Sequence, residues 1–538
     1  MLAFRNGKRT FCSHQKPSST DLKYRLRVKS QFRFEKCVPI MRSRKLIFAS
    51  MIALAFNQKM NAQDSNTTVP FGLEVAESPA EPPFRYAFAT PEPEIGPETI
   101  EELSKRLTAL ESKESLAEAK LQWLGDAKKP TVEKPKFPNV AINGVFQADA
   151  VAFNQLDSSR DAYGRVEGGA DFRRARLSAK GAASDRMDYF MQMDFGFFGR
   201  PTFTDVWADF KDVGSIGTFR VGQWKQPFGL ETVSSFRYTT FMERSSLFQA
   251  FTPFRHIGVG FYNHSDDLNW TWAASYFRTG QDQFGGSLST DGGNGGAARL
   301  THLLWHDGAK GEDYLHIGSG YFLNAPPNER TRFRSIPEIF VGEFVVPTGV
   351  PLGTSGQPVP DVANGTPFFV DTGTISGTSL TQTFGLESMW VRGPISWQSE
   401  AMGCFVDTSS TGNAFLNGAY SQVGWFLTGE HRPYDRKAGA IDRVIPIHSV
   451  SKCGGGWGAW EVAGRWSYLD VTDRQIQGGM MQNMTAGLNW YVNPNCKCVF
   501  NYIHSWADSR PIRNGVITSN DFISSQTDAF GMRCQLDF

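Results

Sequence analysis

The chain has 538 residues, of which 20% are charged and 13% aromatic, and its formal net charge is +1. This composition excludes a disordered chain, and no run of about 18 or more apolar residues provides a membrane-spanning helix. The charge is uneven along the chain: positions 1–45 hold 13 basic and 2 acidic residues, and the remaining 42 basic and 52 acidic residues give a charge of −10. Nucleic acid is therefore not an expected partner.

Positions 1–62 read as an upstream extension followed by a secretion signal. Met41 opens a short basic stretch, and an apolar run of signal-peptide length follows at positions 46–56. This pattern predicts a signal at about 41–62, with cleavage near Ala62. We expect the first 40 residues to reflect an overlong start; a long basic region of the signal itself is the alternative. The protein is expected to be exported.

Two non-globular segments follow the signal. Positions 63–97 are rich in Pro, Glu, Ser and Thr and have no apolar period, which predicts a disordered linker. Positions 98–126 place apolar residues at alternating spacings of three and four, at Ile100, Leu103, Leu107, Leu110, Ala117, Leu121 and Leu124. This seam predicts a short coiled coil, and a lone amphipathic helix is the alternative.

From residue 137 to residue 538 the apolar period is two, which is typical of β-strands. At the very end, Phe530, Met532, Cys534, Leu536 and Phe538 alternate with small or polar residues. A terminal strand of this kind can close an outer-membrane barrel, whose lipid face alternates with a wet lumen face. An edge strand of a soluble sandwich is the alternative interpretation.

The connections between predicted strands differ in length in a regular way. Short turns, at positions 213–215, 392–394 and 493–495, are set against long polar loops at positions 280–296, 324–380 and 507–526. Trp and Tyr cluster at strand ends, where amphipathic rings would meet lipid headgroups. The sequence therefore predicts an all-β fold: a transmembrane antiparallel barrel of about 16 strands with both ends on the periplasmic side.

The seven cysteines carry no metal-ligand spacing, so no metal or cofactor is expected. Cys496 and Cys498 lie two apart on a predicted strand and share a face, which makes them a poor disulfide pair. We interpret the cysteines as small apolar residues.

Four stretches carry a family resemblance. Residues 219–260 read FRVGQWKQPFGLETVSSFRYTTFMERSSLFQAFTPFRHIGVG, and YSQVGWFLTGEHRPY, WGAWEVAGRWSYLDV and AGLNWYVNP follow in order. These stretches resemble the phosphate-selective porin O and P family, over most of residues 140–538. The resemblance implies a 16-stranded homotrimeric porin of the bacterial outer membrane, in contact with its lipid. It also implies that the third long loop constricts the pore and that cationic side chains pass small anions such as phosphate.

The resemblance and the strand parity together indicate nine candidate pore-lining or anion-binding cations. They are Arg174, Arg176, Lys180, Arg220, Lys225, Arg237, Arg244, Arg255 and Arg465. A narrow pore needs fixed cations to offset the hydration that an anion loses, and an Arg fork matches phosphate oxygens. Four residues have an alternative role as ion pairs bracing the inner wall: Glu430, Arg432, Glu461 and Arg465.

Acidic residues are expected in the lumen as well. Strand parity directs Asp188, Asp194, Asp205 and Asp209 to the same face as the arginines, and residues 137–538 hold 32 basic and 38 acidic residues. Any anion preference must then be local, and we expect Lys225, Arg244 and Arg255 to set it.

Two other functions compete with a porin. The coiled coil could tether the envelope, with the barrel as a structural anchor. An outer-membrane hydrolase would need a nucleophile beside a supported His, but His302, His306, His316 and His504 occur singly and outside known catalytic motifs. The protein is therefore not expected to be an enzyme.

Overall fold

The computed structural model describes residues 136–196, 201–280, 291–308, 311–342, 365–451, 455–513 and 516–538. The predicted signal, linker and coiled coil lie outside these residues, apart from Glu102, Ser104, Lys105 and Thr108, which are helical. No helix in the described parts of the chain is long and apolar enough to cross a lipid bilayer.

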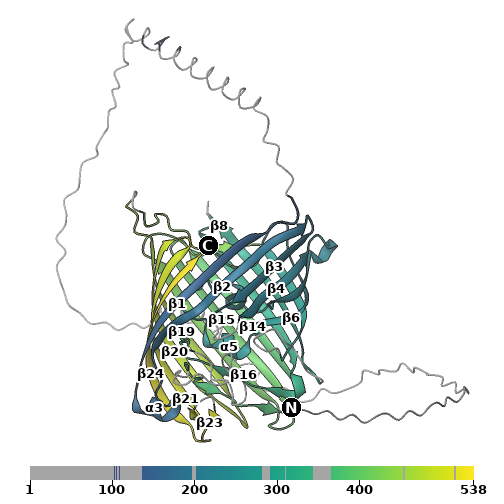
Figure 1. Cartoon of the computed structure of the whole chain (residues 1–538), viewed down its shortest axis with the longest axis vertical. Coiled ribbons are helices and arrows are strands. Elements are labelled where there is room, and N and C mark those ends of the chain that lie inside the picture. Colours follow the sequence, from purple (N-terminus) through teal and green to yellow (C-terminus); the bar gives the residue numbers. More distant parts are fainter. Residues whose placement is uncertain are drawn as a thin grey trace, which may run out of the picture. The chain divides into compact units, whose positions relative to one another are not determined.

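Sixteen antiparallel strands of the described chain form a closed barrel (Figure 1). The closing seam joins the first strand, β1, to the last, β24, with Val145 opposite Asp537 at one end and Gln155 opposite Thr527 at the other. The predicted all-β barrel of about 16 strands is confirmed. Because every strand has two paired neighbours, no unpaired edge faces the membrane.

The barrel strands follow one another around the ring in chain order. They are β1 (Ala141–Gln155), β2 (Gly169–Ser184), β3 (Met187–Asp194), β4 (Thr202–Phe210), β5 (Thr218–Lys225), β6 (Arg255–His264), β7 (Trp270–Arg278), β8 (Asn294–Asp307), β9 (Asp313–Ala325), β14 (Thr378–Arg392), β15 (Ile395–Thr408), β16 (Ala414–Phe426), β19 (Ala459–Asp473), β20 (Ile476–Asn493), β21 (Cys496–Ser509) and β24 (Ile523–Asp537). Several strands extend further into the predicted loops than the sequence pattern suggested.

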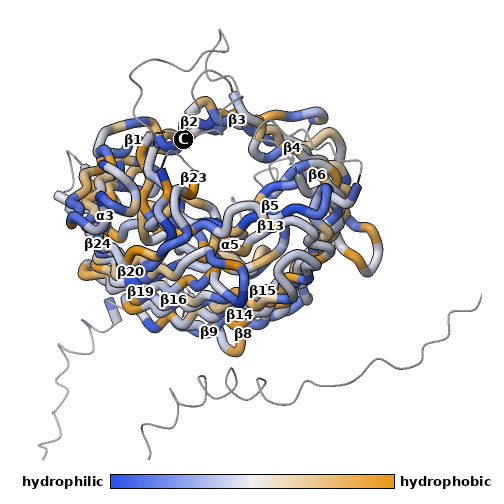
Figure 2. Tube along the Cα trace, turned by 90° about the horizontal axis from the view of Figure 1, so that it is seen from below, coloured by the Kyte–Doolittle hydropathy of each residue, from blue (hydrophilic) through white to orange (hydrophobic). Residues whose placement is uncertain are grey.

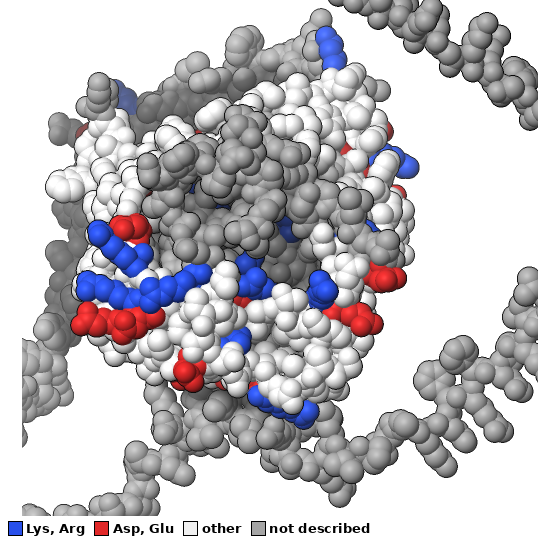
Figure 3. Space-filling model, turned by 60° about the horizontal axis from the view of Figure 1, so that its bottom comes forward, with Lys and Arg blue, Asp and Glu red and all other residues white. Residues whose placement is uncertain are grey.

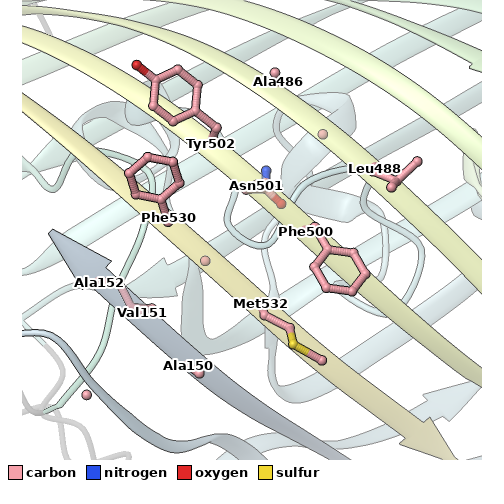
Figure 4. A pocket seen from close by; sticks show the side chains of 13 residues that line it. Ala150, Val151, Ala152, Ala486, Leu488, Phe500, Asn501, Tyr502, Phe530 and Met532 are labelled. Atoms are coloured by element: carbon pink, nitrogen blue, oxygen red, sulfur yellow. The ribbon is translucent and has the colours of Figure 1, made fainter. Parts of the chain in front are cut away.

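The alternation of side chains separates an apolar outer wall from a polar inner one. On β24, Phe530 is 53% exposed and points outward, whereas Arg533 and Gln535 are buried inside. Outward side chains of neighbouring strands form a shallow apolar depression of about 660 Å³, in which Phe500, Phe530 and Met532 stand beside small residues of β1 (Figure 4). The outer wall thus matches the apolar band of a membrane barrel.

Connections at one end of the barrel are short, as predicted: residues 185–186, 393–394 and 494–495 each join two strands. One connection at this end departs from the pattern, because residues 427–458 link β16 to β19 and carry β17 (Tyr434–Asp435) and β18 (Ala440–Ile441). At the opposite end, the longer loops carry α3 (Asp157–Tyr163), β22 (Ile512–Arg513) and β23 (Val516–Ile517).

Two long loops from this opposite end fold into the barrel, so that α5 and β13 lie within the ring of strands (Figure 2). The third loop, residues 226–254, carries α4 (Leu230–Val233) and α5 (Ser246–Phe251). The loop between β9 and β14 carries η2 (Pro327–Glu329), β10 (Arg330–Thr331), β11 (Arg334–Ser335), β12 (Val370–Asp371) and β13 (Ile375–Ser376). An inward third loop is what the family resemblance implied.

An apolar cluster inside the barrel packs these loops against one side of the wall. Phe228, Leu247 and Phe251 of the third loop join Phe333 and Phe369 of the loop between β9 and β14. Wall residues of β15, β16, β19, β20 and β21 join the cluster, together with residues of the loop that carries α3. Gly320 and Gly385 leave room for the Phe228 ring, because a Cβ at either position would lie 3.0 Å or less from a ring atom. The side of the barrel interior that these loops fill is therefore a packed core.

Candidate functional site

The third loop is anchored to the barrel wall by buried carboxylates. Glu400 of β15 accepts hydrogen bonds from the backbone N–H groups of Leu230 (3.0 Å) and Glu231 (2.8 Å), and the Tyr420 hydroxyl donates to the same carboxylate (2.6 Å). Glu338 of the neighbouring loop accepts a hydrogen bond from the N–H of Ser246 (2.8 Å). The start and the helical end of the loop are thus both fixed inside the pore.

Two predicted cations converge on one backbone carbonyl of this loop. The ammonium of Lys225 donates to the carbonyl oxygens of Val233 (2.6 Å) and Ser234 (2.7 Å). The guanidinium of Arg244 donates to the carbonyl oxygens of Glu231 (2.7 Å) and Ser234 (3.0 Å). Among the described residues, neither Lys225 nor Arg244 forms an ion pair with a carboxylate.

Arg244 is only 7% exposed, and burial lowers its pKa to about 10. Glu231 opposes this shift but does not cancel it, while nearby Arg255 and Arg176 add to it. The guanidinium is still charged at neutral pH. Its pKa is lowered mainly because burial removes hydration from the guanidinium, and the neighbouring arginines add to this effect.

Three other predicted cations are paired with the aspartates that strand parity directs into the lumen. Arg255 binds Asp205 (2.7 Å), Arg176 binds Asp194 (2.6 Å), and Arg220 binds Asp209 (2.6 Å). The fourth of these aspartates, Asp188, pairs with Lys211 (3.0 Å). Most of the predicted lumen charge is therefore neutralised pairwise.

The remaining candidates lie in several environments. Arg174 contacts Glu243 (3.4 Å) and Gln147 (2.7 Å), and Arg237 approaches Asp537 at 4.0 Å. Lys180 lines the same lumen cavity of about 510 Å³ as Lys225 and Arg220. Of the nine candidates, the structure brings Arg176, Lys225, Arg244 and Arg255 close enough for their charges to interact.

The bracing role holds for three of the four residues proposed for it. Arg432 and Glu461 form a buried ion pair, and Arg465 pairs with Glu338 and with Glu231 (3.6 Å). Glu430 differs, because it accepts hydrogen bonds from the Thr428 hydroxyl and the Ile447 N–H. Arg465 thus supports the third loop from the wall.

Sequence reasoning missed a group of arginines in the loop between β9 and β14. Arg330, Arg332 and Arg334 alternate along this segment; Arg332 pairs with Asp371 (2.5 Å), and Arg334 lies 4.2 Å from the centre of the Phe368 ring. Figure 3 shows a band of Lys and Arg side chains beside Asp and Glu at this end of the barrel. The period-two spacing of the three arginines could have predicted them, because this spacing places side chains on one face of an extended segment.

The connection 427–458 was also missed as a lumen element. Lys437 and Asp435 line the cavity that Lys225 lines, and the Arg299 guanidinium of β8 donates to the Gly439 carbonyl (2.7 Å). The Ile441 N–H donates to the Ser234 hydroxyl of the third loop (3.1 Å). A long segment at the end that otherwise has short turns therefore reaches the third loop from the opposite side.

Comparison with known proteins identifies the family. The family model for phosphate-selective porins O and P matches residues 140–538, which is the whole barrel. This chain belongs to the phosphate-selective porin O and P family. The porin accordingly lies in the bacterial outer membrane and forms a channel for small solutes, and its family is one of channels rather than enzymes.

Two relatives are similar over most of the porin. Porin O of Pseudomonas aeruginosa is 24% identical over 407 residues, covering 71% of this chain and 86% of the relative. An uncharacterized protein of Caulobacter vibrioides is 24% identical over 507 residues, covering 89% of this chain and 86% of the relative.

Solved porins resemble the barrel distantly. An anion-selective porin from Comamonas acidovorans is 10% identical with a TM-score of 0.44, and the match covers 74% of this chain and 100% of that one. The trimeric outer membrane protein OmpT of Vibrio cholerae is 10% identical with a TM-score of 0.43, over 75% of this chain and 100% of that one.

Proposed function

We propose that this porin prefers small anions, with phosphate and similar oxyanions as the physiological class. The observation that carries the proposal is the pair Lys225 and Arg244, which share the Ser234 carbonyl and make no carboxylate ion pair among the described residues. The family name and the name of the relative porin O agree with this preference.

The geometry of Lys225 suits transient anion binding. An ammonium group has three N–H donors, and two of them are used by Val233 and Ser234. Among the described residues no acceptor takes the third, which can meet an anion in the lumen cavity that Lys225 lines. Binding through a single donor remains weak enough for release, which conduction requires.

The preference must arise locally, because the barrel as a whole is acidic. Charges beyond a Debye length of about 8 Å are largely screened at physiological salt, so the nearest fixed charges dominate inside a narrow passage. Near Lys225 these are Arg176, Arg244 and Arg255 against Asp205. Lys180 and Arg220 line the same cavity and would then act as wall charges along the approach. Arg174, Arg237 and Arg465 would instead brace the inner wall through their carboxylate partners.

Further parts of the proposal concern assembly and processing. The porin would be exported by the signal at about 41–62 and would form homotrimers. The helix at positions 98–126 would add a periplasmic stalk, and the disordered linker at positions 63–97 would precede it. The apolar outer wall supports contact with membrane lipid, and the acidic mature chain argues against binding nucleic acid.

Planar-bilayer recording under a potassium chloride gradient tests the anion preference. The wild-type reversal potential should have the sign of anion selectivity, and Lys225→Gln should shift it toward the cation side. Lys225→Arg keeps the charge and should stay close to wild type. Arg165→Gln removes an exposed positive charge from the loop between β1 and β2 and serves as the control. A wild-type reversal potential in Lys225→Gln would contradict the proposal.

A further inference from the structure

Two cysteines face each other across neighbouring strands near the C-terminus. Cys498 of β21 and Cys534 of β24 are direct cross-strand partners, and their Sγ atoms are 3.4 Å apart. Both side chains belong to the outward row that includes Phe500 and Met532, which are also partners of each other (Figure 4). The two thiols therefore lie on the outer wall, outside the pore and its charged lining.

The ladder geometry at this position favours a bond between the two sulfurs. The Asp537 N–H donates to the Asn495 carbonyl (2.9 Å), which makes Asn495 and Asp537 a hydrogen-bonded pair. Since pair types alternate along an antiparallel ladder, Cys498 and Cys534, three positions further, form a non-hydrogen-bonded pair. The Cα atoms of such pairs are about 4.5 Å apart, within the range that a disulfide bridges.

We propose that Cys498 and Cys534 are joined by a disulfide during export of the porin. An outer-membrane protein crosses the periplasm, an oxidising compartment in which disulfides form and persist. The oxidant is a protein disulfide of the periplasm. The thiolate of one cysteine attacks this disulfide and displaces one of its sulfurs as a thiolate, and the second cysteine then displaces the other from the mixed disulfide. In total, two porin thiols are oxidised to one disulfide and the oxidant disulfide is reduced to two thiols. The two protons that the porin thiols lose are taken up by the thiolates of the oxidant.

The other cysteines of the described barrel are less suited to this bond. Cys496 faces Leu536 and lies diagonal to Cys534, and it shares a strand face with Cys498. Cys404 is buried on β15, whose strand partners are β14 and β16. Cys496 and Cys404 therefore stay as thiols. The interpretation of the cysteines as small apolar residues changes only for Cys498 and Cys534.

The bond would fix the last strand before the barrel closes. β24 pairs with β21 on one side and with β1 on the other, so its register sets the closing seam. A one-residue slip of β24 would turn its apolar row toward the lumen. A covalent link at Cys498 and Cys534 holds the register of this hairpin independently of β1.

Peptide mapping of the mature porin tests the pairing directly. Outer membranes are denatured with an alkylating reagent and no reductant, and the porin is digested with trypsin. Cleavage after Lys497 and Arg533 separates the three thiols, placing Cys496 in peptide 475–497, Cys498 in peptide 498–513 and Cys534 in peptide 534–538. We expect peptides 498–513 and 534–538 to appear as one disulfide-linked species, and Cys496 to be alkylated. Alkylation of both Cys498 and Cys534, or a link from 534–538 to 475–497, overturns the proposal.

Thermal unfolding with and without reductant tests the stabilising role. Reduction should lower the unfolding temperature of the wild type and of the control Cys496→Ala. It should have no effect on Cys498→Ala or Cys534→Ala, whose oxidised samples should already unfold at the lower temperature. A wild type that is insensitive to reductant would show that no bond secures the hairpin.

Discussion

Arg432 and Glu461 form an ion pair sealed inside the barrel, with 1% and 0% of their side chains exposed. Arg432 comes from the connection 427–458, and Glu461 comes from β19 in the wall. The Tyr491 hydroxyl (2.9 Å) and the Asn489 amide (2.9 Å) donate to the second oxygen of Glu461. The pair fastens an inward segment to the wall.

Arg432→Leu should destabilise the porin strongly, because it leaves the buried charge of Glu461 without its cation. Loss of one partner of a buried ion pair costs about 3–5 kcal/mol. Unfolding of the refolded porin in urea, followed by tryptophan fluorescence, measures the change. The double variant Arg432→Leu with Glu461→Leu should recover much of the loss. As a control, Arg165→Leu disrupts an exposed pair with Glu167 and should cost less than about 1 kcal/mol. Additive effects in the double variant would contradict this account.

Gly320→Ala should displace the third loop from the wall. The new Cβ would lie 2.9 Å from the Phe228 ring, which is fully buried and cannot move without disturbing the interior cluster. Overpacking of this kind costs about 1–3 kcal/mol. Gly464→Ala, on another wall strand, is the matched control. A Cβ at Gly464 would lie 4.0 Å from its nearest neighbour, the Thr485 carbonyl oxygen. Equal unfolding midpoints for the two variants would show that Phe228 does not need this space.

Glu400→Gln should loosen the start of the third loop and raise the single-channel conductance. The carboxylate accepts two backbone N–H bonds from Leu230 and Glu231, and the neutral amide offers one oxygen in place of two. Each such hydrogen bond contributes about 0.5–1.5 kcal/mol. Glu329→Gln, on the exposed segment η2, is the control and should conduct as the wild type does. A conductance unchanged in Glu400→Gln would mean that other contacts position the loop.

Deletion of residues 98–126 should leave a folded barrel and weaken its assembly. The predicted seam would add self-association, whereas the barrel has its own closed set of strands. The dissociation temperature of the oligomer on gels should fall, while the barrel keeps its heat-dependent mobility. If the dissociation temperature does not change, the helix does not self-associate.

The sequence was sufficient for the barrel but not for its interior. The alternation from Phe530 to Phe538 predicted the closing strand, because in a barrel period two reports directly which side chains meet lipid. It could not reveal that Arg255 is paired with Asp205 or that Cys498 faces Cys534. Those contacts depend on the register between strands, and register is set by bulges and turns that the pattern does not specify.

The path of the connection 427–458 into the barrel also could not be predicted from the sequence. The charged residues of this connection do not indicate whether it folds into the pore. A polar segment at the end of a strand has the same sequence pattern whether it enters the pore or extends into solvent. Lys225, in contrast, could be predicted from the sequence. It lies in a stretch that resembles the family, and this stretch contains a predicted strand end. Its two carbonyl partners became visible only with the folded loop.

The interior packing makes the channel eccentric. The apolar cluster occupies the side bounded by β15, β16, β19 and β20, whereas the lumen cavity is lined by residues of β2 to β8 (Figure 2). A permeating ion therefore follows one arc of the wall rather than the central axis. Substitutions on the inner face of β3 to β6 should alter transport with little effect on folding, and equivalent changes on β15 to β20 should do the reverse. The arc from β2 to β8 thus serves transport, and the arc that contacts the apolar cluster serves stability.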